Sequence, residues 1–215
     1  CAASGAGSFA PVMEALDTRT LISDLQSTLR KQLQRCEEFR QLPLELLLRR
    51  PAPNRWSVLE VIEHMNLSSG HYHDRLQRIY ADENNRLRFR TTFAPGNWGQ
   101  RMVNTMQPKA DGTIPWKMPT IGKFEPRFDG VPDLQPLDRF VAILNGFIGM
   151  LERARTRGLE GEKVVSTLGP ILRFEAGDAF RFSIAHQERH LLQIGRTLEQ
   201  LAQEMPMRSA GQVPV

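Results

Sequence analysis

Apolar residues recur every three or four positions in four long stretches of this chain. In the first, from residue 16 to about residue 39, the repeat is carried by Leu21, Ile22, Leu25, Leu29 and Leu33. This spacing matches the period of an α-helix and predicts a helix over the whole stretch. By the same reasoning, three further helices are expected, over residues 57–80, 136–157 and 178–204.

Two of the expected helices carry recognisable end signals. Ser57 is followed three residues later by Glu60, the spacing of a capping box in which each residue satisfies a free backbone N–H of the first turn. Gly158 follows the third helix and is typical of a C-terminal stop. The chain shows four amphipathic helices and no strong β-strand pattern. This predicts an all-α fold, namely a four-helix bundle.

Two connections between these helices contain many prolines. Residues 41–55 hold three, so the chain must redirect there, and residues 81–134 hold six, together with many glycines. The second segment is expected to be a long connection between helices two and three, of the kind that forms lids, binding walls or disordered segments. Its aromatic residues indicate that it packs on the body of the protein: Phe93, Trp98, Trp116, Phe124 and Phe128. A later connection, residues 159–177, is expected to hold a short extended piece at "KVVSTL".

The pattern predicts a single domain. A chain of 215 residues is long enough to bury a sizeable core. We expect the domain to span residues 16–204, preceded by a disordered N-terminal segment over residues 1–15 and followed by a flexible tail over residues 205–215. No apolar run approaches the ~20 residues that a transmembrane helix needs, so no membrane span is expected.

Charge and cysteine content narrow the class of protein. The net charge is +4, and the arginines are dispersed without an aromatic-interleaved basic stripe, which argues against nucleic-acid binding. Cys1 and Cys36 are too few for a disulfide framework and suit a reducing compartment, so a cytoplasmic location is expected. As an alternative, "CAASGAGS" at the start is typical of a lipid-anchored protein attached through Cys1, whereas Met13 just before the first helix fits a natural start.

All five histidines fall in the second and fourth predicted helices. On a helical wheel, His64 lies at the edge of the apolar arc of the second helix, and His186 and His190 lie one turn apart at the edge of the fourth. His71 lies on nearly the same flank as His64 and is a reserve candidate, whereas His73 points to the far side. The imidazoles of both helices therefore border the buried face.

These histidines have two interpretations. A pair spaced by four residues on a helix edge is more often a half-exposed polar boundary than a metal pair, and a lone histidine near an apolar face is more often a satisfied boundary residue. Two such edges that meet across a cleft would instead bring three imidazoles together, which is the arrangement of a catalytic zinc-type site. Glu60 is interpreted first as a cap and second as a partner of a metal ligand.

Two segments together resemble the DinB-like superfamily, metal-binding four-helix bundles of bacteria. They are "NRWSVLEVIEHMNLSSGHYHDRL" and, much later, "AGDAFRFSIAHQERHLLQIGRTL". The resemblance is carried by Trp56 and Ser57 at the opening of a helix, by His64 after them, and by the His-x-x-x-His pair His186 and His190 on the last helix. It fits the chain from about residue 16 to residue 203.

The resemblance implies that His64, His186 and His190 bind a divalent metal, commonly zinc or nickel, with water completing the shell. It further implies a metal-dependent thiol S-transferase or a hydrolase acting on a small-molecule substrate, with a low-molecular-weight thiol such as bacillithiol or mycothiol as co-substrate. The alternative is a non-catalytic stress-response or binding protein with a structural metal. Residues 81–134 match no family motif and are expected to wall the cleft, and a homodimer is compatible with the pattern.

Overall fold

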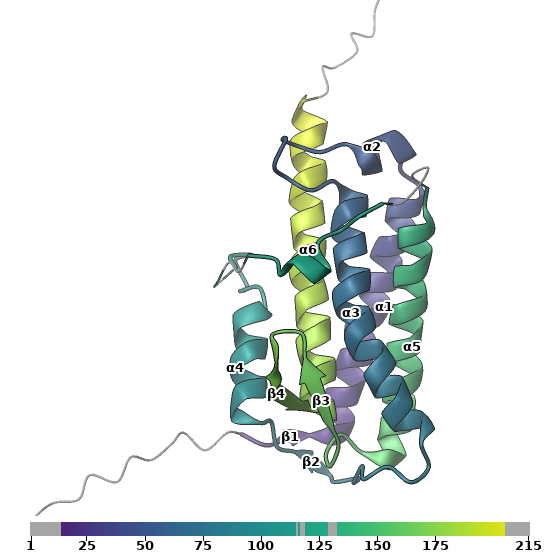
Figure 1. Ribbon diagram of the computed structural model, residues 1–215, viewed down its shortest axis with the longest axis vertical. Helices are drawn as coiled ribbons and strands as arrows, with labels where there is room; N and C mark the ends of the chain where they lie inside the picture. The colour runs from purple at the N-terminus through teal and green to yellow at the C-terminus, as the bar shows by residue number, and fades with distance from the viewer. Residues whose placement is uncertain (1–13, 115, 117–118, 129–132, 205–215) are drawn as a thin grey trace, which may run out of the picture.

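The computed structural model describes residues 14–114, 116, 119–128 and 133–204. This part of the chain is mostly helical and carries two small two-stranded sheets (Figure 1). Of the predicted N-terminal segment, all but residues 14 and 15 lie outside the described residues, and so do Cys1 and the predicted tail.

The four predicted helices are present, and each predicted end lies within two residues of the observed one. They are α1 (Thr18–Arg40), α3 (Val58–Ala81), α5 (Gln135–Arg157) and α6 (Ala176–Glu204). The helices lie side by side, with α1 and α3 each in contact with both α5 and α6 (Figure 1). Their apolar stripes therefore share one core, whose large, fully buried side chains include Ile22, Leu29, Tyr72, Phe140, Phe147 and Phe180.

The end signals predicted for α3 and α5 are confirmed. Ser57 Oγ accepts a hydrogen bond from the Glu60 backbone N–H at 3.3 Å, and the Glu60 carboxylate accepts one from the Ser57 N–H at 2.8 Å. The same carboxylate pairs with Arg50. At the end of α5, Gly158 has a φ of +92°, and a Cβ there would overlap the backbone oxygen of Arg88, so glycine is required.

The expectation of an all-α chain needs a correction, because two short sheets are present. Strand β1 (Leu16–Asp17) pairs antiparallel with β2 (Thr92–Phe93), and β3 (Lys163–Ser166) pairs antiparallel with β4 (Gly169–Glu175). Strand β3 confirms the extended piece expected at "KVVSTL". Strand β4 went unrecognised because α6 begins at the next residue, so no turn signal separates the strand from the helix.

Two further helices correct the view of the connections. The segment 81–134 contains α4 (Asn97–Met106) and a 3₁₀ turn, η1 (Gly122–Phe124), and the segment 41–55 contains α2 (Leu44–Leu48). Helix α4 packs against α6, with Val103 and Met106 buried. It has no side-chain cap at its start and is only 10 residues long, so prolines and glycines on both sides concealed it.

A buried carboxylate fixes α4 to the start of α6. Asp178, which is 0 % exposed, accepts hydrogen bonds from the Gly96 N–H at 2.8 Å and from Arg181 Nη1 at 2.9 Å. Arg181 also donates to Gln100 of α4 at 2.6 Å, and a Cβ at Gly99 would overlap the Asp178 carboxylate. Burial raises the pKa of Asp178, against the opposing influence of the Gly96 N–H and Arg181. Asp178 and Arg181 together therefore hold the start of α4 against α6.

We expect Asp178→Ala to lower the free energy of unfolding by about 3 kcal/mol, because it leaves the Arg181 guanidinium, whose side chain is 10 % exposed, without its carboxylate and the Gly96 N–H without an acceptor. Urea denaturation of both proteins measures this. The matched control is Asp111→Ala, since Asp111 is exposed and bonds only the nearby Thr113. An equal, small loss in both variants would contradict the role of Asp178.

Candidate metal centre

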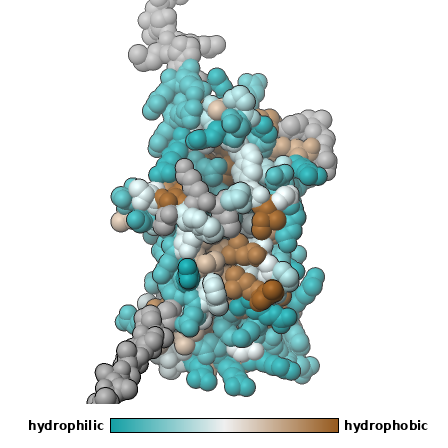
Figure 2. All heavy atoms as spheres, turned by 60° about the vertical axis from the view of Figure 1, so that its left-hand side comes forward, coloured by the Kyte–Doolittle hydropathy of each residue, from teal (hydrophilic) through white to brown (hydrophobic). Residues whose placement is uncertain are grey.

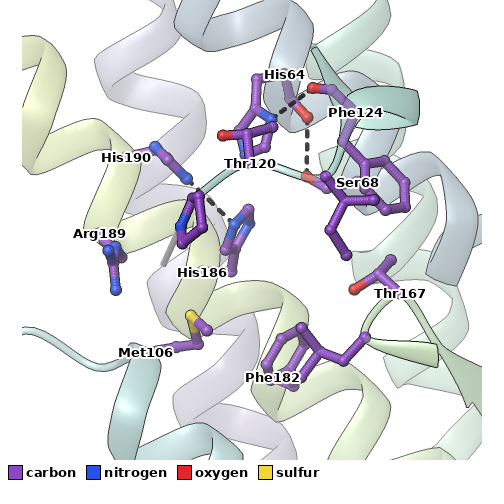
Figure 3. A pocket seen from close by; sticks show the side chains of 13 residues that line it. His64, Ser68, Met106, Thr120, Phe124, Thr167, Phe182, His186, Arg189 and His190 are labelled. Atoms are coloured by element: carbon purple, nitrogen blue, oxygen red, sulfur yellow. Dashed lines mark hydrogen bonds between the residues drawn. The ribbon is translucent and has the colours of Figure 1, made fainter. Parts of the chain in front are cut away.

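The contact between α3 and α6 brings three histidines together. His64 lies in the second turn of α3, and His186 and His190 lie one turn apart on α6 (Figure 3). His64 is 6 % exposed, His190 is 8 % exposed and His186 is half-buried. One ring nitrogen of each lies within 4.8 Å of those of the others. The two helix edges that the sequence singled out therefore meet.

The distances between the rings suit a shared ligand. The ring centroids of His64 and His190 lie 4.7 Å apart, those of His186 and His190 4.5 Å, and those of His64 and His186 5.3 Å. The Nε2 atoms of His186 and His190 are 3.1 Å apart. Two nitrogens bonded at ~2.0–2.1 Å to one tetrahedral or octahedral ion lie about 2.9–3.4 Å apart. The His186–His190 spacing matches that geometry, and three imidazole donors suit a first-row divalent metal.

Two of the imidazoles are oriented by their other ring nitrogen. His64 Nδ1 lies 2.8 Å from the carbonyl oxygen of Phe124, and because a carbonyl only accepts, Nδ1 carries the proton and Nε2 a lone pair. His190 Nδ1 lies 2.9 Å from Gln193 Oε1, which favours the same tautomer. Metal-binding histidines usually have such partners. Sequence reasoning missed Phe124, because its contribution is a backbone carbonyl with no side-chain signature.

The electrostatics keep all three rings neutral. Burial lowers the pKa of His64, moves that of His190 down to about 3 and holds that of His186 well below its usual value. Repulsion by the neighbouring rings lowers the pKa values of His186 and His190 further. The positive charge of Arg189 lowers the pKa values of all three histidines. Neutral imidazoles present lone pairs at neutral pH, so no proton has to leave before a metal binds.

Comparison with known proteins assigns the family. A family model described as the DinB superfamily matches residues 25–194, which include all three histidines. The chain belongs to the DinB superfamily. No curated protein and no solved structure matches it. The resemblance inferred from Trp56, Ser57 and the histidines is therefore confirmed at the level of the family.

A cavity opens beside the histidines of this DinB-superfamily chain. Its empty volume, mouth included, is about 550 Å³. The long connection supplies one side of it, as the sequence led us to expect, through Met106, Pro119, Thr120, Ile121 and Phe124. Figure 2 shows hydrophobic atoms gathered on the face that carries α4 and the β3–β4 hairpin. Exposed side chains on these two elements include Trp98 and Ile171.

Three other residues considered from the sequence do not join this cluster. His71 Nε2 hydrogen-bonds the Val165 carbonyl oxygen at 2.8 Å, so the reserve ligand is engaged with β3. His73, predicted to point to the far side of its helix, packs edge-on against Phe147 of α5 at 5.7 Å. Glu60 caps α3 and pairs with Arg50. The expectation for Glu60 as a cap is confirmed.

Among the described helices of this DinB-superfamily chain, none is long and apolar enough to cross a membrane.

Proposed function

We propose that this protein is a metal-dependent enzyme in which His64, His186 and His190 hold a divalent ion, zinc or nickel. In this proposal α1, α3, α5 and α6 form a four-helix bundle of the DinB-like type that carries the site. The observation behind it is the cluster itself: three neutral imidazoles, two with an orienting partner, facing one cavity. In the described part of the chain no fourth histidine, cysteine or carboxylate joins them. Three protein ligands leave a coordination position for a small molecule, as in catalytic sites.

The lining of the cavity favours a thiol as the reacting group. A divalent ion supplies Lewis acidity, which lowers the pKa of a coordinated water or thiol. The described lining residues include no carboxylate that would act as a general base. A free thiol has a pKa of about 8.5, so it needs far less help to ionise than water does. We therefore rank transfer of a low-molecular-weight thiol to a small electrophile before hydrolysis.

The alternative function, from another class, is a non-catalytic stress-response or binding protein with a structural metal. A structural site is closed by protein ligands, whereas this cluster borders a cavity with apolar walls. The cavity supports chemistry at the site. The cytoplasmic location and the homodimer stay predictions from the sequence.

We expect the wild-type protein, incubated with zinc or nickel and desalted, to retain about one ion per chain, as a three-histidine site would. His190→Ala removes one of three ligands and should retain little. Metal analysis of the purified proteins measures this. The control is His71→Ala, since His71 is on α3 but bonds Val165. The same low metal content in wild type and His190→Ala would contradict the site.

A second expectation concerns the orientation of His190. Gln193→Leu removes the acceptor of the His190 Nδ1–H and should weaken metal binding about 10–100-fold without loss of helix content. Competition with a chelator measures the affinity, and circular dichroism the helix content. Gln200→Leu is the matched control on the same helix, because among residues 14–204 as described Gln200 bonds Pro51 and Glu204 and no histidine. Equal affinity in Gln193→Leu and wild type would show that this contact does not orient the ligand.

A third expectation distinguishes the two functions. The metal-loaded protein should accelerate consumption of low-molecular-weight thiols by small electrophiles, and removal of the metal by a chelator should return the rate to the uncatalysed one. Thiol disappearance, followed by a colorimetric reagent, gives the rate. If the metal-loaded protein shows no acceleration with any thiol or electrophile tested, and chelation lowers its melting temperature, the structural alternative is favoured.

A further inference from the structure

Arg189 lies on α6 between two of the histidines and lines the same cavity (Figure 3). It is half-buried, and its positive charge lowers the pKa of His64, His186 and His190 alike. The charge of Arg189 thus acts on all three imidazoles. The proposed function gives it no role.

Arg189 has no carboxylate partner within the described residues. Its hydrogen bond there runs from Nη1 to the backbone oxygen of Trp116 at 2.6 Å, and it forms no ion pair. By contrast, Arg181, whose side chain is 10 % exposed, is paired with Asp178. A guanidinium has five N–H donors, and the described residues use one of those of Arg189, so the others can bind a ligand.

The charge of the cavity requires a negative ligand. Three neutral imidazoles leave the charge of a divalent ion uncompensated, and Arg189 adds a further positive charge. No described residue that lines the cavity is acidic. Burying cations without counter-charge is unfavourable, so a bound molecule that brings negative charge is selected over a neutral one.

We propose that Arg189 determines the specificity of this cavity and that the small molecule bound there carries a carboxylate. This inference rests on the proposed function. The carboxylate pairs with the guanidinium fork, whose planar geometry matches it. The apolar part of the molecule lies against Phe182, Ile121 and Met106, and its metal-binding atom faces the histidines.

A carboxylate fits this lining better than a phosphate does. A phosphate brings more charge and more acceptor oxygens, and these need several charged donors. Arg189 is the single charged side chain among the described lining residues. Three hydroxyl groups also line it: Ser68 already donates to the His64 carbonyl oxygen and Thr167 is bonded to Tyr72, which leaves Thr120 as one neutral donor.

A purely structural role for Arg189 would be to hold the segment at Trp116 through its hydrogen bond. Arg196 offers a matched control for that role. It also lies on α6 and donates to a backbone oxygen of the same connection, that of Gly112 at 2.7 Å, but it does not line the cavity. Arg189→Gln and Arg196→Gln each keep an amide donor and lose the charge, so a difference between them isolates the cavity.

The experiment titrates the full chain, loaded with Co²⁺, with mercaptopropionate and with its methyl ester, and follows cobalt absorption. In wild type and in Arg196→Gln the carboxylate should bind more tightly than the ester. In Arg189→Gln the ratio of the two dissociation constants should fall by at least about tenfold. Arg189→Lys, which keeps the charge, should retain most of the preference.

An unchanged ratio in Arg189→Gln, with cobalt and both thiols bound, overturns the role of Arg189 and leaves the metal site standing. Equal losses in Arg189→Gln and Arg196→Gln overturn it too, since they indicate a structural effect. If wild type binds no cobalt, the proposed function fails. The test of Arg189 then uses metal-free protein: hexanoate should raise the melting temperature of wild type more than hexanamide does, and Arg189→Gln should abolish that difference. Its persistence would overturn the inference.

Discussion

The burial of three imidazoles where α3 meets α6 constrains the rest of the structure. A ring nitrogen removed from water needs a hydrogen-bond partner or a ligand, because an unsatisfied polar group in the interior is costly. His64 obtains its partner from the carbonyl oxygen of Phe124, which requires the turn η1 to sit against α3. His190 obtains one from Gln193 on its own helix. One remaining nitrogen of each ring lies within 4.8 Å of those of the other two, where a single metal would satisfy three of them at once.

The walls of this cavity are attached to the long helices by a few buried polar contacts. Asp178 holds the start of α4 through Gly96 and Arg181. On the other side, the Tyr72 hydroxyl lies 3.1 Å from Ser166 Oγ and accepts from the Thr167 N–H at 3.0 Å, which fixes the turn between β3 and β4. The elements inserted between the long helices therefore have defined positions, and they shape the space open to a substrate.

The proposed metal ligands and most of the surfaces proposed to contact a substrate come from different parts of the molecule. The proposed ligands come from α3 and α6, whose positions follow from the packing of the core. The surfaces that a substrate would touch come largely from the connection and the hairpin, and are mostly apolar. Arg189 joins the two parts, since it extends from the helix of two histidines to the backbone of Trp116 in the connection. The positive charge of Arg189 at this junction therefore lies beside a mostly apolar cavity.

The sequence by itself determined the four long helices, the cap at Ser57 and Glu60, and the helix edges that carry His64, His186 and His190. Each of these features depends on residues within a few helical turns of one another, so the spacing of apolar residues and the cap residues indicate it in the sequence. Tertiary structure alone decided that these edges meet, that the Phe124 carbonyl orients His64, that His73 packs on Phe147 and that Asp178 anchors α4. These contacts join positions about 60 to 126 residues apart, and several use backbone groups, which every residue type shares. No local pattern encodes them, because their energy arises only when distant segments have already packed together.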